Sequence, residues 1–133
     1  MKVLMINGSA RRKGNTYLAL CEIAKTLELQ GVESEIIQTG TKAVRGCIAC
    51  NQCKMKQLNS CVFNDDICNI VVEKLANADA LIVGSPTYYG QPMAQSYHSS
   101  NVYSTQIRWE RRTNQLPLLP FAAVEEVPQS FRH

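Results

Sequence analysis

The stretch KVLMIN, residues 2–7, followed by GSARRKGNT, residues 8–16, decides the fold of this 133-residue chain. A short apolar run that stops at a glycine, without alternating polar side chains, is typical of a parallel strand covered on both faces. After the polar loop, we expect a helix that is capped by Asn15 or Thr16 and ends at Gly31. Apolar residues recur there at helical spacing: Leu18, Leu20, Cys21, Ile23, Ala24, Leu27 and Leu29.

The same alternation of strand and helix continues along the chain. We expect a second strand over 33–38, a functional loop of about twenty residues, a helix over 67–76 capped by Asp65 or Asp66, and a third strand over 79–84. One face of that helix carries Ile67, Ile70, Val71 and Leu75. This order predicts right-handed crossovers and an α/β fold, a doubly wound parallel sheet in a three-layer α/β/α sandwich.

Length and composition limit the classes of function. A chain of 133 residues, 45% hydrophobic and 19% charged, is expected to form a single domain. The net charge of +3 without a long basic run gives little support for binding to nucleic acid or to a membrane surface. No apolar stretch approaches the roughly 20 residues that span a bilayer, and the first apolar run is too short for a signal peptide. We therefore expect a cytoplasmic protein.

The loop GSARRKGNT lies between the first strand and its helix. Helix-start N–H groups, the hydroxyls of Ser9 and Thr16 and the guanidinium of Arg11 can surround a phosphate there, and Gly8 and Gly14 allow close backbone approach. The loop is neither a Walker loop nor a dinucleotide fingerprint. The alternative is a polar turn with solvated arginines.

A second loop, GSPTYYGQP over 84–92, directly follows the third expected strand. The carboxyl ends of parallel strands share one edge of a sheet, so this loop is expected to share a crevice with the first. Tyr88 and Tyr89 can form a flat wall for an aromatic ring. The alternative is a surface turn with one tyrosine packed on the core.

Six cysteines are present, and four of them lie in the long loop as Cys47-x2-Cys50-x2-Cys53-x7-Cys61. In a reducing compartment, metal or redox roles are favoured over disulfides. This spacing lets four thiolates hold a 4Fe-4S cluster, and it also suits zinc or redox-active thiols. Cys21 and Cys68 are expected to be small buried hydrophobic residues.

Taken together and in this order, the two loops and the cysteines resemble the flavodoxin-like NADPH-dependent FMN reductases and the related iron-sulfur flavoproteins, over Met1 to about Gln95. The resemblance implies that the FMN phosphate is held by Ser9, Arg11, Gly14, Asn15 and Thr16, and that the isoalloxazine is lined by Pro86, Thr87, Tyr88, Tyr89 and Gly90. In that family the flavin takes hydride from NAD(P)H and passes electrons to an acceptor, here expected to be a small molecule. The family also implies a homodimer or homotetramer.

The cysteine spacing resembles the compact motif of iron-sulfur flavoproteins, in which a cluster on residues such as Cys47, Cys50, Cys53 and Cys61 feeds electrons to FMN. No general base or nucleophile constellation is present, so no catalytic side chain is assigned. Three functions follow as alternatives: an FMN-dependent oxidoreductase, an iron-sulfur electron carrier, and an inactive truncated product.

The segment from about Ala94 departs from the family pattern. It contains no Gly, Lys, Asp or Cys. If each codon's third base begins a new codon, the sequences allowed over 96–105, 108–115 and 121–126 include LSFLERLFYS, MGAANKP and CRRGG, which are family-like and in family order. We therefore expect 96–133 to be an out-of-frame tail, with the shift between Pro92 and Tyr97 and the fold incomplete at its C-terminal side. An authentic divergent tail is the alternative.

Overall fold

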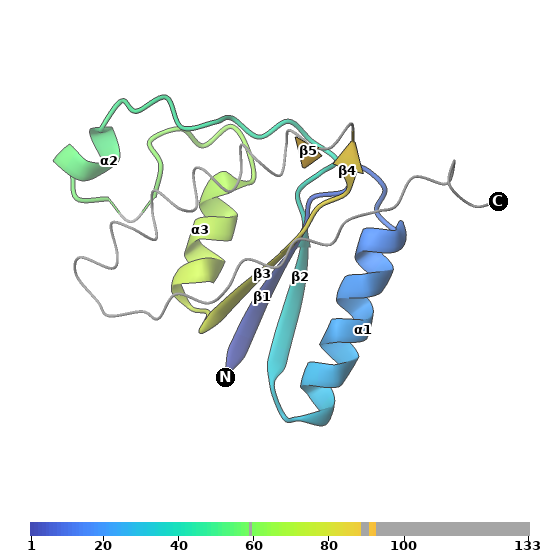
Figure 1. Ribbon diagram of the computed structural model, residues 1–133. Coiled ribbons are helices and arrows are strands. Elements are labelled where there is room, and N and C mark those ends of the chain that lie inside the picture. Colours follow the sequence, from blue (N-terminus) through green and yellow to red (C-terminus); the bar gives the residue numbers. More distant parts are fainter. Residues whose placement is uncertain (59, 89–90, 93–133) are drawn as a thin grey trace.

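The computed structural model describes residues 1–58, 60–88 and 91–92 (Figure 1). Three parallel strands, β1 (Lys2–Asn7), β2 (Glu33–Gln38) and β3 (Ala80–Gly84), form a sheet in the order β2-β1-β3. In the register, Val3 lies between Ser34 and Ala80. The first strand along the chain, β1, is thus the middle strand of the sheet, as in a doubly wound fold.

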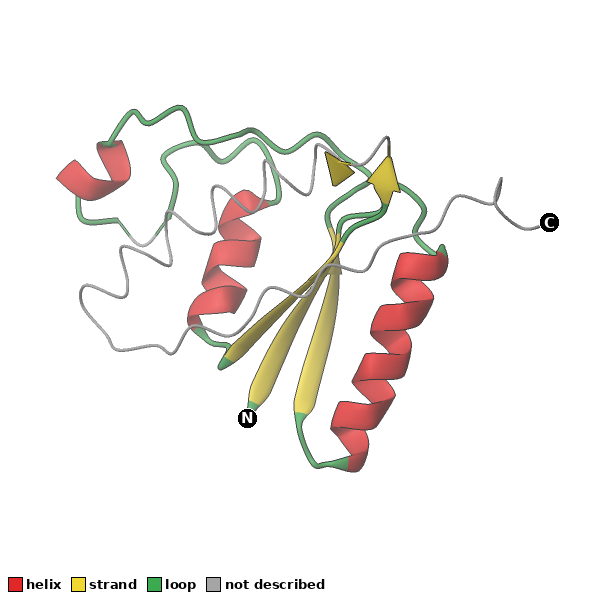
Figure 2. Cartoon of the chain, viewed as in Figure 1, coloured by secondary structure: helices red, strands yellow, loops and turns green. Residues whose placement is uncertain are grey.

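Helices cover both faces of this sheet (Figure 2). Helix α1 (Asn15–Leu29) lies on one side, and α3 (Cys68–Ala76) lies on the other. Side chains of β1 alternate between the two layers: Leu4 and Ile6 belong to a core cluster with α3, whereas Val3 and Met5 belong to one with α1. All four are at most 2% exposed, which explains why the strand reads as an unbroken apolar run. The three-layer α/β/α prediction is confirmed.

The expected elements are present, with shifts at their ends. Helix α1 has Gly14 as its N-cap, with the Leu18 N–H donating to the Gly14 carbonyl at 3.1 Å, so neither Asn15 nor Thr16 caps it. Helix α3 begins at Cys68, whose N–H donates to Asp66 Oδ1 at 2.7 Å. Strand β3 begins one residue later than expected, at Ala80, and the Asp79 carboxylate before it accepts the Lys2 N–H at 2.7 Å.

Several apolar residues expected on buried helix faces are exposed. Leu18 and Leu29 are 57% and 89% exposed, and Ile70 is 52% exposed. Each helix packs along one narrow stripe, centred on Leu20 in α1 and on Val71 in α3, and residues to the side of that stripe face water. Cys21 is half-buried rather than a core residue, whereas Cys68 is buried as expected.

Two segments expected to be plain loops contain short elements. The cysteine loop includes one helical turn, α2 (Gln52–Met55), and the second loop forms an antiparallel ribbon from β4 (Thr87–Tyr88) and β5 (Gln91–Pro92). No helix in the described part of the chain is long and apolar enough to cross a membrane. The expected out-of-frame tail, 96–133, lies outside the described residues.

Candidate functional site

The loops after β1 and β3 meet at the carboxyl edge of the sheet, as expected (Figure 1). The Gly8 N–H donates to the Gly84 carbonyl at 2.8 Å, which joins the start of the first loop to the end of β3. The Thr39 N–H donates to the Asn7 carbonyl at 3.0 Å, so the end of β2 is joined to the same edge. All three strands therefore contribute to one polar rim.

Ser9 and Thr16 point inward from the first loop and from the start of α1, respectively. They are 3% and 1% exposed, while Arg11 and Asn15 are exposed. The Ser9 Oγ accepts the Arg11 N–H at 3.1 Å, which leaves the hydroxyl proton free for another acceptor. A Cβ added at Gly14 would lie 3.1 Å from the Arg11 Cβ and 3.7 Å from the Ser9 Oγ, so the loop closes tightly around this glycine.

Thr16 carries a buried hydroxyl without a hydrogen-bond partner among the described residues. Its methyl group faces Gly84, where an added Cβ would lie 2.8 Å from Thr16 Cγ2. Helix α1 and strand β3 therefore approach closely because Gly84 has no side chain. Buried hydroxyls are normally paired, so an unpaired one in the first turn of a helix indicates a place for a ligand acceptor.

The electrostatics of this corner favour an anion. Three cations, Arg11, Arg12 and Lys13, directly precede α1, and none of them has an ion pair with a described carboxylate. The first turn of α1 carries no acidic residue, so nothing there opposes the positive end of the helix dipole. Its free N–H groups add donors.

The second loop places Pro86 and Thr87 next to the sheet edge and leaves Tyr88 more open. Pro86 is buried, Thr87 is half-buried, and Tyr88 is 47% exposed. Part of the Tyr88 side chain is therefore open to a flat partner. Tyr89 and Gly90, the other expected flavin contacts in this loop, lie outside the described residues.

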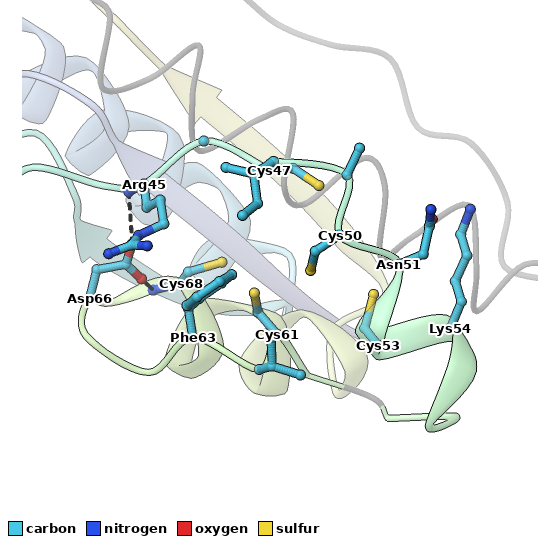
Figure 3. Close-up of a pocket in the computed structure, with 14 residues that line it drawn as sticks. Arg45, Cys47, Cys50, Asn51, Cys53, Lys54, Cys61, Phe63, Asp66 and Cys68 are labelled. Carbon is cyan, nitrogen blue, oxygen red and sulfur yellow. Dashed lines mark hydrogen bonds between the residues drawn. The ribbon is translucent and has the colours of Figure 1, made fainter.

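The cysteine loop leaves the same edge of the sheet, passes through α2 and returns to α3 (Figure 1). Its two arms enclose a pocket of about 180 Å³, to which Cys47, Cys50, Cys53 and Cys61 all contribute. Figure 3 shows Cys50, Cys53 and Cys61 with their sulfur atoms directed into the space between the arms. The structure therefore gathers the four predicted ligands around one pocket, and all four are free thiols.

A fifth thiol, Cys68, lines the same pocket from the start of α3 (Figure 3). It is 3% exposed. Burial, followed by the nearby Asp66 carboxylate, raises the pKa of Cys68 to about 12. Cys68 therefore stays protonated at neutral pH and is a weak ligand compared with the exposed Cys47 and Cys50.

The backbone turns sharply on both sides of Cys50. Ala49 and Asn51 have φ values of 54° and 56°, in the left-handed region. Asparagine tolerates this conformation, but for alanine it costs about 1–2 kcal/mol. Strain of this kind is common where a loop must aim a functional side chain.

Arg45 ties the two arms of the loop together. Its N–H donates to Asp66 Oδ2 at 2.8 Å, its Nη2 lies 2.5 Å from Asp65 Oδ2, and its guanidinium lies 4.7 Å from the centre of the Phe63 ring. Asp65 and Asp66, which were expected to cap α3, therefore close the loop, whereas the N-cap residue of α3 is Ile67. These contacts hold the start of the loop against the residues that precede α3.

The side chains that line the pocket include the type of ligand that an iron-sulfur cluster requires. Four thiols from two arms of one loop match the soft ligands that iron-sulfur clusters use. In the described part of the chain, no group of three or more His, Cys, Asp or Glu side chains is arranged to hold a single metal ion. The four thiols therefore fit a cluster in their donor chemistry.

Three positioning residues, Asn7, Gln38 and Asn69, were missed by sequence reasoning. Asn7 and Gln38 bond to each other and to Ser9, and Asn69 bonds to Cys61. For Asn7, the available signal was a polar residue at the end of an apolar strand; Gln38 ends a strand that is largely polar and gives no such signal. Asn69 gives no comparable signal.

Comparison with known proteins places the chain in a family. The model of the family "NADPH-dependent FMN reductase" matches residues 1–99. An iron-sulfur flavoprotein of Methanocaldococcus jannaschii is 40% identical over 95 residues, which is 71% of this chain and 48% of that protein. An iron-sulfur flavoprotein of Archaeoglobus fulgidus is 39% identical over 90 residues, or 68% of this chain and 42% of that protein.

Solved structures agree on the fold. A flavone reductase covers 94% of this chain and 43% of its own length, with a TM-score of 0.58 and 18% identity. RosB, solved with the bound intermediate 8-demethyl-8-formylriboflavin-5'-phosphate, gives a TM-score of 0.56 at 14% identity, over 94% of this chain and 51% of its own. The chain spans about half the length of the curated relatives it matches. By its sequence match and its parallel three-layer fold, this chain belongs to the NADPH-dependent FMN reductase family.

Proposed function

We propose that this chain is an FMN-dependent oxidoreductase that carries electrons from NAD(P)H through the flavin to a small acceptor. The observation that carries the proposal is the buried hydroxyl of Thr16, which has no partner among the described residues, at the positive end of α1 and beside the buried Ser9. Three cations precede the same helix, and none of them pairs with a carboxylate in the described part of the chain. A phosphate monoester supplies the acceptors and the negative charge that this corner lacks.

Each side chain has a separate task in this proposal. The hydroxyls of Ser9 and Thr16 donate hydrogen bonds to the phosphate, and the first N–H groups of α1 add backbone donors. Arg11 neutralises the charge of the phosphate from the exposed side. Gly14 leaves room for the phosphate within the loop, and Asn15 borders it. Bound FMN supplies hydride acceptance and one-electron chemistry.

The second loop is proposed to hold the ring end of the flavin. The buried Pro86 and the half-buried Thr87 form the floor, and the half-exposed Tyr88 offers a face for stacking. Tyr89 and Gly90 are proposed to complete this wall. Excluding water on one face of the ring protects reduced flavin from side reactions.

The direct test is an anaerobic absorption spectrum of the purified chain after incubation with FMN and desalting. A retained two-banded flavin spectrum supports the proposal, and a colourless protein contradicts it. Thr16→Val, which removes only the hydroxyl, should weaken FMN binding about tenfold. Thr26→Val is the matched control, because the Thr26 hydroxyl bonds to the Glu22 carbonyl on the exposed side of the same helix.

A second function, an iron-sulfur electron carrier, is favoured by the shared pocket of Cys47, Cys50, Cys53 and Cys61. The relatives named iron-sulfur flavoproteins support the same proposal. Anaerobic reconstitution with ferrous iron and sulfide should then give four irons and four acid-labile sulfides per chain. Cys61→Ser should abolish this loading and Cys21→Ser, on α1, should not. Zinc without sulfide in the purified protein would contradict the cluster.

The proposed assembly and location follow the family. We propose a cytoplasmic homodimer or homotetramer that serves a small-molecule acceptor and binds neither nucleic acid nor membranes. Light scattering coupled to size exclusion tests the assembly. Steady-state rates with NADH and NADPH, measured on flavin-loaded protein, test the electron donor.

A further inference from the structure

A closed ring of hydrogen bonds lies beneath the first loop and joins Asn7, Gln38 and Ser9. Asn7 Nδ2 donates to Gln38 Oε1 at 2.6 Å, Gln38 Nε2 donates to the Ser9 carbonyl, and the Ser9 N–H donates to Asn7 Oδ1 at 3.1 Å. Asn7 is 0% exposed. Both side-chain amides use their oxygen and their nitrogen within the ring, so their orientations are fixed by each other.

The ring connects strands that are far apart in sequence. Asn7 ends β1 and Gln38 ends β2, and these two residues face each other in the parallel register. The Asn7 carbonyl also accepts the N–H groups of Thr39 and Gly40, at 3.0 and 3.3 Å. The backbone on both sides of the ring is therefore held, and the first loop cannot shift without breaking several bonds.

Gly40 adds a steric limit from the other side. A Cβ at this position would lie 2.2 Å from the Gly8 carbonyl oxygen and 2.4 Å from the Ser9 backbone. The chain after β2 therefore presses directly on the turn that contains Ser9. The hydrogen-bonded ring and this close packing fix one position for Ser9.

The position of Ser9 decides where its hydroxyl points. The Ser9 Oγ accepts the Arg11 N–H at 3.1 Å, so its free proton is directed away from that amide, and the path of residues 9–11 follows from the ring. In the proposed function, Ser9 contacts the flavin cofactor through one hydrogen bond to its phosphate. The ring therefore acts on the phosphate end of the ligand alone.

We propose that Asn7 and Gln38 are positioning residues that set Ser9 for the phosphate and thereby make the site select FMN over the unphosphorylated flavin, riboflavin. The inference rests on the proposed function. It assigns the selectivity to a ring that does not itself touch the ligand. Riboflavin, without the phosphate, gains nothing from a correctly placed Ser9.

The test uses Gln38→Met in the full chain, because methionine keeps the length of the side chain and removes both hydrogen bonds of Gln38. The FMN dissociation constant should rise about tenfold, as for the loss of one charge-assisted hydrogen bond, while that for riboflavin changes less than about twofold. Ser34→Ala, near the other end of β2, is the matched control and should change neither. Equal losses for both flavins, or no loss for FMN, would overturn the proposal.

A second measurement on the ligand-free chain keeps this test independent of flavin binding. Amide hydrogen exchange at Ser9 and Arg11 should be faster in Gln38→Met than in the parent chain and in Ser34→Ala. Unchanged exchange at both amides overturns the positioning role even when FMN binds. A parent chain that binds neither flavin overturns the proposed function instead, so the two failures are distinguishable.

Discussion

Asn69 on α3 holds both backbone groups of Cys61: its Oδ1 accepts the Cys61 N–H at 2.7 Å, and its Nδ2 donates to the Cys61 carbonyl at 3.0 Å. The same Nδ2 lies 3.1 Å from the Phe63 carbonyl. One side chain therefore fixes the arm of the loop that presents the fourth cysteine. The position of Cys61 is set by the fold and does not wait for a cluster.

We predict that Asn69→Ala releases this arm. Amide exchange at Cys61 should rise by up to about tenfold, and the free energy of unfolding should fall by about 1 kcal/mol, as expected for lost hydrogen bonds. Iron and sulfide loading after anaerobic reconstitution should fall as well. Asn77→Ala is the control, because the Asn77 side chain bonds to the Glu73 carbonyl at the far end of the same helix, away from Cys61. Equal effects of the two variants on Cys61 exchange would contradict the prediction.

The buried thiol of Cys68 makes the free energy of unfolding depend on pH in the alkaline range. Its pKa, about 12, lies above the ordinary thiol value of about 8.5. Between these two values the unfolded chain loses the proton and the folded chain keeps it, so the folded state binds more protons and stability falls as pH rises. Below pH 8.5 this contribution is fully present.

The measurement is urea unfolding across pH 8 to 11 for the parent chain and for Cys68→Ala. The difference between their unfolding free energies should shrink as pH rises through this range. A constant difference would show that the buried thiol titrates normally. Alkylation with iodoacetamide at pH 8 should also modify the exposed Cys47 and Cys50 well before Cys68.

Ala49 offers a test of backbone strain in the cysteine loop. At φ 54°, glycine avoids a steric cost of about 1–2 kcal/mol, which offsets the entropy that glycine adds to the unfolded chain. Ala49→Gly should therefore leave the unfolding free energy unchanged or raise it slightly. Ala19→Gly, in the middle of α1, should lower it by about 1 kcal/mol. A clear loss of stability in Ala49→Gly would refute the strain.

The reading frame of the last residues is a prediction that sequencing can check. We expect that a single-base gain or loss between codons 92 and 97 restores the family pattern over 96–133. Sequencing the gene across codons 90 to 130 is the measurement. If no single-base change restores that pattern, the segment is an authentic divergent tail. The frame-corrected product should then be compared with this chain for FMN binding.

Much of the fold could be predicted from the sequence because its strongest signals are local. The apolar run of β1, the helical spacing of α1 and the glycines after the strands each lie within a few residues. Leu18 and Ile70 show the limit of this reasoning: periodicity gives a helix face, but the stripe that meets the sheet depends on tertiary packing. Helix α2, with four residues, is too short for any periodic signal.

The residues of the candidate site could be predicted from the sequence, whereas the residues that position them could not. Ser9, Thr16 and the four cysteines stand in recognisable patterns, because their chemistry requires particular residues at particular spacings. Gln38 and Asn7 are 31 residues apart, and their bond exists only because β1 and β2 pair in one register. Such a contact has no local signature, so it can be found only once the strands are placed.

The central place of β1 in the sheet has a consequence for synthesis on the ribosome. Its first neighbour, β2, is complete at residue 38, whereas its second, β3, is complete only at residue 84. During the intervening translation, one edge of β1 presents unpaired backbone groups beside apolar side chains, which favours contact with other nascent chains. The cysteine loop is made in this same interval, before the sheet that supports it is closed. A cell that needs this protein in quantity therefore benefits from a chaperone that shields the nascent half-sheet.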